Sequence, residues 1–223
     1  MSLKMGGTTA LIAEGVAVVA LAAALAHAGS EHGATLIAGL FLGLCQWRSW
    51  RFDDARVLGD GLALGGLVVR LDEPLAALQR SVWWLLLAVV LTFPPFVVAW
   101  RLALNPVESF VPTRALANLQ PLAELALVAL PEEAFFRGYL QSRLAESSSR
   151  RFGLLTHANL VASALFALGH FGTAISFARA SVFFPSLLFG VLRERTGGIV
   201  VPMIFHALCN VLSRVLFQGF GLV

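Results

Sequence analysis

The sequence predicts an all-α protein, a polytopic transmembrane bundle of about seven or eight helices. Of its 223 residues, 58% are hydrophobic and only 13% are charged, whereas soluble domains carry about 25% charged residues. Apolar runs close to 20 residues long recur along the chain, and this is the length that a helix needs to cross a bilayer. The runs are continuous rather than alternating, so helices rather than a strand barrel satisfy the backbone inside the membrane.

Seven segments have the length and composition of a spanning helix. They are residues 8–28, 34–50, 82–100, 119–140, 155–172, 176–193 and 198–217. The tryptophans lie at the ends of predicted spans, where indole rings favour the membrane interface: Trp47, Trp50, Trp83, Trp84 and Trp100. We predict one membrane-embedded domain over residues 1–223, in which residues 1–118 carry no motif and residues 119–217 carry the chemistry.

The first segment, residues 8–28, has two interpretations. Lys4, an apolar core and the small residues Ala26 and Ala28 resemble a secretory signal with its cleavage site. Glu14 interrupts the core and a second apolar segment follows, which favours an uncleaved anchor. Glu14 then either faces the bundle interior or lies near the inner membrane interface.

In the second segment, Gly39 and Gly43 form a G-x-x-x-G spacing. Such glycines let two helix backbones approach closely, and we expect packing inside the bundle rather than dimerisation. The sequence defines no oligomeric state. The connection at residues 51–81 is the one sizeable polar stretch, and we assign no chemistry to it.

The basic residues predict the orientation and exclude some partners. With the N-terminus inside, eleven of the sixteen Lys and Arg residues lie in cytoplasmic segments and three in outer loops. Because basic residues concentrate on the cytoplasmic side, we predict a cytoplasmic N-terminus in the plasma (inner) membrane. The composition is typical of bacteria. These residues lie between apolar runs rather than on one face, so we expect the lipid bilayer and no nucleic acid as a partner.

The fourth segment contains two adjacent acids, Glu132 and Glu133, followed by Arg137. Glu133 and Arg137 are i, i+4 on a helix and can pair, whereas Glu132 points about 100° away. One carboxylate can therefore be neutralised while its neighbour stays available as a general base. Alternatively, Pro131 and the two acids form an ordinary first helical turn. Glu124, two turns earlier, is a further candidate for the same cavity.

The fifth and seventh segments carry the remaining polar candidates. His206 and Asn210 are i, i+4, so both leave one helix face, and two convergent donors suit an oxyanion or hold helices together. His170 ends the fifth segment and reads either as a catalyst or as an interfacial residue. It would lie nearer the outer surface than Glu132, unless residues 171–178 form a buried turn.

These three motifs in register, E-E-x-x-x-R, F-x-x-x-H and H-x-x-x-N, resemble the CAAX protease and bacteriocin-processing (CPBP, Abi) family of glutamic-type intramembrane endopeptidases. The matching positions are Glu132, Glu133, Phe135, Phe136, Arg137, Gly138, Phe166, His170, His206 and Asn210. The resemblance implies that Glu132 and His170 activate a water for attack on a peptide bond. It also implies that His206 and Asn210 hold the oxyanion, and that Glu133 and Arg137 brace the first motif.

The expected partner is a membrane-associated protein or peptide, cleaved in a leader or a C-terminal tail, and no cofactor is expected. A zinc site built from the same residues is the weaker alternative, because H-E-x-x-H is absent. Cys45 and Cys209 lie in apolar segments and suggest neither a disulfide nor a metal site. A non-catalytic immunity or scaffold protein is the competing class. A transporter is a third possible class, and the lack of a visible inverted repeat in the sequence argues against it.

Overall fold

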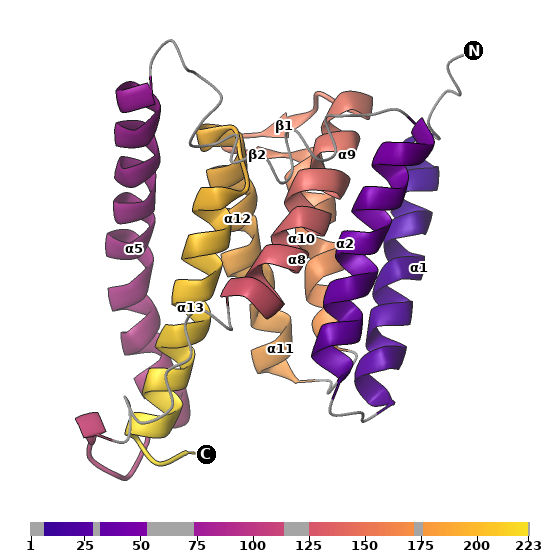
Figure 1. The fold of residues 1–223 in the computed structure, drawn as a ribbon. Helices are drawn as coiled ribbons and strands as arrows, with labels where there is room; N and C mark the ends of the chain where they lie inside the picture. Colours follow the sequence, from indigo (N-terminus) through magenta and orange to yellow (C-terminus); the bar gives the residue numbers. More distant parts are fainter. Residues whose placement is uncertain (1–6, 29–31, 53–73, 114–124, 172–175, 223) are drawn as a thin grey trace.

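A computed structural model describes residues 7–28, 32–52, 74–113, 125–171 and 176–222 (Figure 1). Its elements are α1 (Thr8–His27), α2 (Gly33–Phe52), α5 (Pro74–Leu104), η1 (Leu125–Ala129), α8 (Leu130–Glu133), η2 (Ala134–Gln141), α9 (Ser142–Ser147), β1 (Arg151–Phe152), β2 (Leu155–Thr156), α10 (His157–His170), α11 (Phe177–Ser181), α12 (Phe183–Thr196) and α13 (Val200–Gly219). Every segment predicted to be helical contains a helix.

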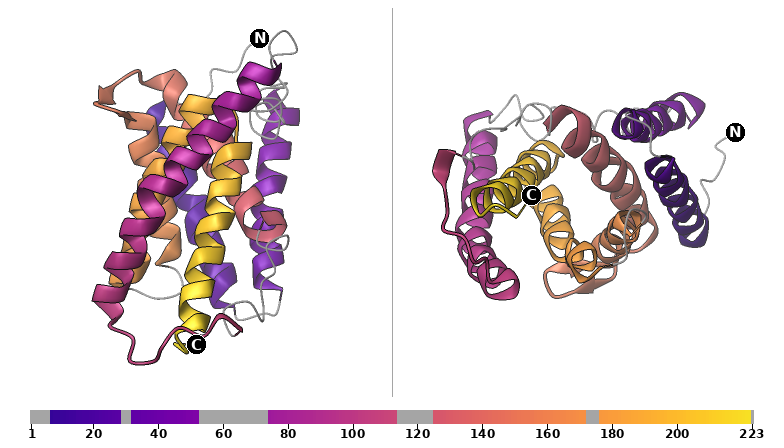
Figure 2. Two further views of the ribbon diagram at one scale, coloured as in Figure 1. Left: turned by 90° about the vertical axis from the view of Figure 1, so that its left-hand side faces the viewer. Right: turned by 90° about the horizontal axis from the view of Figure 1, so that it is seen from below.

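The helices run side by side as one bundle whose ends are formed by the N-terminal pair and by α5. Seen along the helices, α1 and α2 lie at one end and α5 at the other (Figure 2). Between them, α10 packs against α1 and α12, and α13 packs against α12 and α5. The continuous helical segment from η1 to α9 contacts α2, α10 and α13. The motif-bearing helices are thus covered on several sides by other helices.

Three helices among the described residues are by themselves long and apolar enough to cross a membrane: Thr8–His27, Leu78–Leu104 and Val200–Gly219. The prediction of seven full spans is therefore only partly met. The fifth segment forms the 14-residue helix α10, about 21 Å long, and the sixth is divided into α11 and α12. These are shorter than the hydrocarbon core of about 30 Å.

The fourth segment departs from a regular α-helix around the two acids. The π-helical turns η1 and η2 flank the short α-helix that carries Glu132 and Glu133. Pro131 lacks the N–H that would continue the regular ladder to residue 127, and η1 ends two residues earlier, at Ala129. π-Helical turns occur frequently at functional sites, so the backbone itself marks this segment.

Close approach between helices depends on two glycines. A side chain at Gly190 of α12 would lie 2.0 Å from Asn159 Oδ1, and one at Gly15 of α1 would lie 2.8 Å from Leu165 Cδ1. The Asn159 side chain instead donates to the Leu187 carbonyl (2.9 Å) and accepts from the Ser163 hydroxyl (3.0 Å). The buried Asn159 amide can make these hydrogen bonds because the facing position on α12, Gly190, has no side chain.

The expectation that Gly39 and Gly43 mark helix packing inside the bundle is wrong. Both glycines are exposed, and within the described part of the chain a Cβ atom at either position would meet nothing within 4 Å. α2 instead turns Phe41 and Cys45 inward, exposed by 4% and 1%. The large aromatic side chain, rather than the small-residue stripe, decides which face of α2 is buried.

Glu14 faces the bundle interior, as the first of the two alternatives for this residue predicts. Its carboxylate accepts hydrogen bonds from both Arg48 Nε (3.0 Å) and Arg48 Nη2, and from the Tyr139 hydroxyl (2.9 Å). A carboxylate in a membrane segment requires such partners. Glu124, most of the 51–81 connection and the centre of the proposed 171–178 turn lie outside the described residues.

Candidate active site

Glu133 and Arg137 form a fully buried ion pair, as their i, i+4 spacing predicts. Arg137 Nε lies 3.2 Å from Glu133 Oε2, and both side chains have 0% exposure. Both residues belong to the helical segment formed by α8 and η2. Because a buried charge is tolerated only when it is paired and hydrogen-bonded, this pair indicates a polar centre inside an otherwise apolar bundle.

Arg137 is held from the opposite side by α12. Its Nη2 donates to the backbone carbonyl of Ser186 (2.8 Å) and to the Ser186 hydroxyl (2.6 Å). The guanidinium also lies over the rings of Phe166 (4.8 Å) and Phe189 (5.1 Å). Hydrogen bonds, the ion pair and aromatic faces together fix the cation.

His206 of α13 lies between the two glutamates. Its Nδ1 is 3.0 Å from Glu133 Oε1 and its Nε2 is 3.7 Å from Glu132 Oε2. The ring stacks on Phe189, with centroids 4.7 Å apart and planes 17° apart. The Glu133 carboxylate also pairs with Arg137, so it is the acceptor in this contact and His206 Nδ1 is the donor. Nε2 is thereby aimed at Glu132.

Glu132 is the less constrained of the two acids. Its side chain is 19% exposed, whereas that of Glu133 is fully buried. Among the described residues none hydrogen-bonds Glu132 Oε2, and His206 Nε2 at 3.7 Å is beyond a good hydrogen bond. The carboxylate is therefore near an imidazole and still has acceptor capacity for a water or a substrate.

His170 ends α10 and is half-buried. Its Nδ1 lies 2.9 Å from the Phe166 carbonyl, and a carbonyl only accepts, so Nδ1 carries the proton and Nε2 is an acceptor in the neutral ring. Phe166 contacts both imidazoles, with ring centroids 4.6 Å from His170 and 5.7 Å from His206. One aromatic residue thus separates the two histidines.

Asn210 lies one turn beyond His206 on α13 and is half-buried. In the described part of the chain, no side chain or backbone group hydrogen-bonds its amide. Glu132, Glu133 and His206 thus lie together at a polar centre in the bundle. His170 is linked to this centre through Phe166.

Two residues that contact this centre were not identified in the sequence. Ser186 and Phe189 of α12 hold Arg137 and His206, yet we assigned no site residue to the sixth segment. Ser186 is a lone serine in an apolar run, and this was the only available signal. Phe189 resembles every other core phenylalanine, so nothing in its local sequence could identify it.

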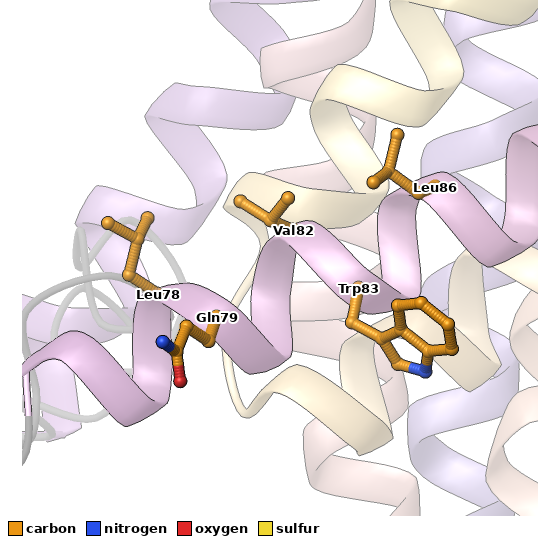
Figure 3. A pocket seen from close by; sticks show the side chains of 5 residues that line it. All are labelled: Leu78, Gln79, Val82, Trp83 and Leu86. Atoms are coloured by element: carbon orange, nitrogen blue, oxygen red, sulfur yellow. The ribbon is translucent and has the colours of Figure 1, made fainter.

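The described residues contain no group of three His, Cys, Asp or Glu side chains that could hold a metal ion. The absence of a cofactor stays a prediction. A shallow apolar hollow occurs elsewhere, along the outer face of α5, and none of the candidate residues reaches it (Figure 3). It is lined by Leu78, Gln79, Val82, Trp83 and Leu86.

Comparison with known proteins supports the motif assignment. Residues 114–212 match the family model described as type II CAAX prenyl endopeptidase Rce1-like. No curated protein and no solved structure is significantly similar to the chain. The matched range contains the paired glutamates, both histidines and Asn210. Residues 114–212 thus carry an Rce1-like domain of the CAAX protease type, in a chain whose apolar helices suit an integral membrane protein.

Proposed function

We propose that the protein hydrolyses a peptide bond of a membrane-associated protein or peptide, using a water activated by Glu132 and His170 and no cofactor. The observation that carries this proposal is the unequal treatment of the two acids. Glu133 is neutralised by Arg137 and engaged by His206, whereas Glu132 keeps a free acceptor atom beside the same imidazole. A carboxylate with acceptor capacity beside an imidazole suits a general base.

The proposed reaction begins with a water bound to Glu132 and to His170 Nε2. Glu132 takes one proton while the water oxygen bonds to the scissile carbonyl carbon. The resulting oxyanion accepts hydrogen bonds from His206 Nε2 and the Asn210 amide. In this scheme His206 acts as the imidazolium, which donates from Nδ1 to Glu133 and from Nε2 to the oxyanion. The carbon–nitrogen bond then breaks, and the proton passes from Glu132 to the departing amine.

Glu133 and Arg137 act in this scheme through His206 rather than on the substrate. Glu133 accepts from Nδ1, and Arg137 holds that carboxylate in place through the ion pair. Ser186 and Phe189 would support this arrangement from α12. The substrate would present a leader or a C-terminal tail near the bilayer, and we propose a cytoplasmic N-terminus in a bacterial inner membrane from the distribution of basic residues.

The test compares the termini of membrane proteins in cells that produce the wild-type, Glu132→Gln or His170→Ala protein. We expect wild-type-dependent termini to fall about a hundredfold or more in both variants. Glu146→Gln is the matched control, because it makes the same change at a glutamate with a 48% exposed side chain in the next helix, and it should retain all termini.

Full processing by Glu132→Gln would show that the assigned base is wrong. Inactivation of the purified protein by a chelator, with recovery on adding zinc, would favour the metal alternative. If the protein's biological effect survives replacement of both Glu132 and His206, the non-catalytic class is correct.

A further inference from the structure

A two-stranded hairpin connects α9 to α10 outside the candidate active site. Arg151 pairs with Thr156 and Phe152 with Leu155, and the His157 amide donates to the Arg150 carbonyl (2.9 Å). Gly153 and Leu154 are the two central residues of the turn, and of these Gly153 alone has a positive φ, 63°. A positive φ at the first central residue alone is typical of a type II′ turn. The hairpin is therefore a defined structure rather than an irregular loop.

The hairpin is tied to the bundle through Glu194 of α12. Glu194 Oε1 accepts from the Thr156 hydroxyl (2.6 Å) and from Gln141 Nε2 (3.0 Å). Its Oε2 accepts from Arg151 Nη2 (3.2 Å). One carboxylate thus fixes the base of the hairpin to two helices, so the direction in which its tip points is set by the fold.

The tip of this hairpin exposes two large apolar side chains. Phe152 is 59% exposed and Leu154 is 68% exposed. The tip projects sideways from the end of the bundle rather than along the helix axes (Figure 2). Helix axes in a membrane protein run roughly along the bilayer normal, so a sideways projection places the tip over the surrounding lipid instead of in bulk water.

The surroundings of the tip are positively charged. Residues 142–156 and 190–197 together contain five arginines against two glutamates. Arg150 is exposed, and no acidic side chain among the described residues pairs with it. Basic residues beside exposed aromatic and aliphatic groups match a bilayer surface with anionic headgroups, which takes up both the apolar groups and the charge.

We propose that the Arg150–Leu154 hairpin tip is a lipid-binding anchor, with Phe152 and Leu154 inserted at the headgroup boundary and Arg150 bound to the phosphates of anionic lipids. The anchor would fix the height of α9 and α10 in the bilayer. It does not depend on the peptidase mechanism, and a protein without any activity would still show it.

The test measures how fast a water-soluble maleimide reacts with a cysteine at the tip in vesicles. Phe152→Cys is compared with Ser149→Cys, an exposed position three residues earlier. The wild-type protein gives the background, because Cys45 is buried and Cys209 is partly buried. In vesicles with roughly one third phosphatidylglycerol, we expect labelling of Phe152→Cys to be about tenfold slower than labelling of Ser149→Cys.

The lipid and the arginine are then varied. In phosphatidylcholine vesicles, or with Arg150→Gln as a second substitution, we expect the protection of the residue 152 cysteine from labelling to fall about fivefold. Equal labelling of both cysteines in anionic vesicles would overturn the proposal, as would protection that is independent of anionic lipid. Protection that disappears when the protein is diluted with additional lipid would show that the tip contacts a second copy of the chain instead.

Discussion

The buried Arg137–Glu133 pair allows a quantitative prediction about the candidate site. We consider Arg137→Met, which keeps a long unbranched side chain and removes the charge. The substitution removes the ion pair at 3.2 Å and two hydrogen bonds to Ser186. It also leaves the buried Glu133 carboxylate without the guanidinium that it pairs with. Breaking a buried pair by removing one partner costs about 3–5 kcal/mol.

The matched control is Arg151→Met. Arg151 Nη2 also lies 3.2 Å from a glutamate oxygen, but its side chain is 59% exposed. Because solvent screens exposed pairs, we expect this control to lose less than about 1 kcal/mol. The same substitution at the same separation thus tests whether burial determines the energy of the pair.

The assay is unfolding in mixed micelles, followed through the fluorescence of the native tryptophans. A third protein, Arg137→Met with Glu133→Gln, removes both charges, and we expect it to recover about 1–3 kcal/mol relative to Arg137→Met alone. Equal losses for Arg137→Met and Arg151→Met would refute the role of burial. A double variant no more stable than the single one would show that the uncompensated carboxylate is not the cause.

The same unfolding measurement tests three further predictions. Gly190→Ala should lose about 1–3 kcal/mol, because its Cβ would overlap the Asn159 amide; an unchanged midpoint would mean that α10 and α12 are not so close. Glu14→Gln should lose about 1–3 kcal/mol, since Arg48 then faces an amide in place of the carboxylate that it binds at two atoms. Gly39→Ala should change stability by less than about 0.5 kcal/mol, and a large loss would indicate a contact that the monomer does not have.

The helical segments could be predicted because their signal is local. A run of about 20 apolar residues has few alternatives in a membrane, and each predicted segment contains a helix. The pairing of Glu133 with Arg137 was also predictable, since i, i+4 residues share a face whatever surrounds the helix. The π-helical turns beside Pro131 could not be predicted, because a shift of the hydrogen-bond ladder by one residue leaves the apolar pattern almost unchanged.

The outward position of Gly39 shows where local patterns fail. A G-x-x-x-G spacing says that two backbones can approach, but which helix supplies the second backbone depends on how the whole helix is rotated. In α2 the burial of Phe41, which stacks on Phe135 at 5.0 Å, sets that rotation. The glycines then face away from the bundle.

The sequence by itself determined that this is a membrane protein of helices, that its polar candidates lie on three of them, and that Glu133 rather than Glu132 is neutralised within its own helix. Only the tertiary structure decided that His206 lies between both acids and that α12 holds the centre through Ser186 and Phe189. The physical reason is that spacing along a helix fixes relative directions within that helix alone. Contacts between residues 73 positions apart, such as Glu133 and His206, arise only when all helices are rotated and packed together.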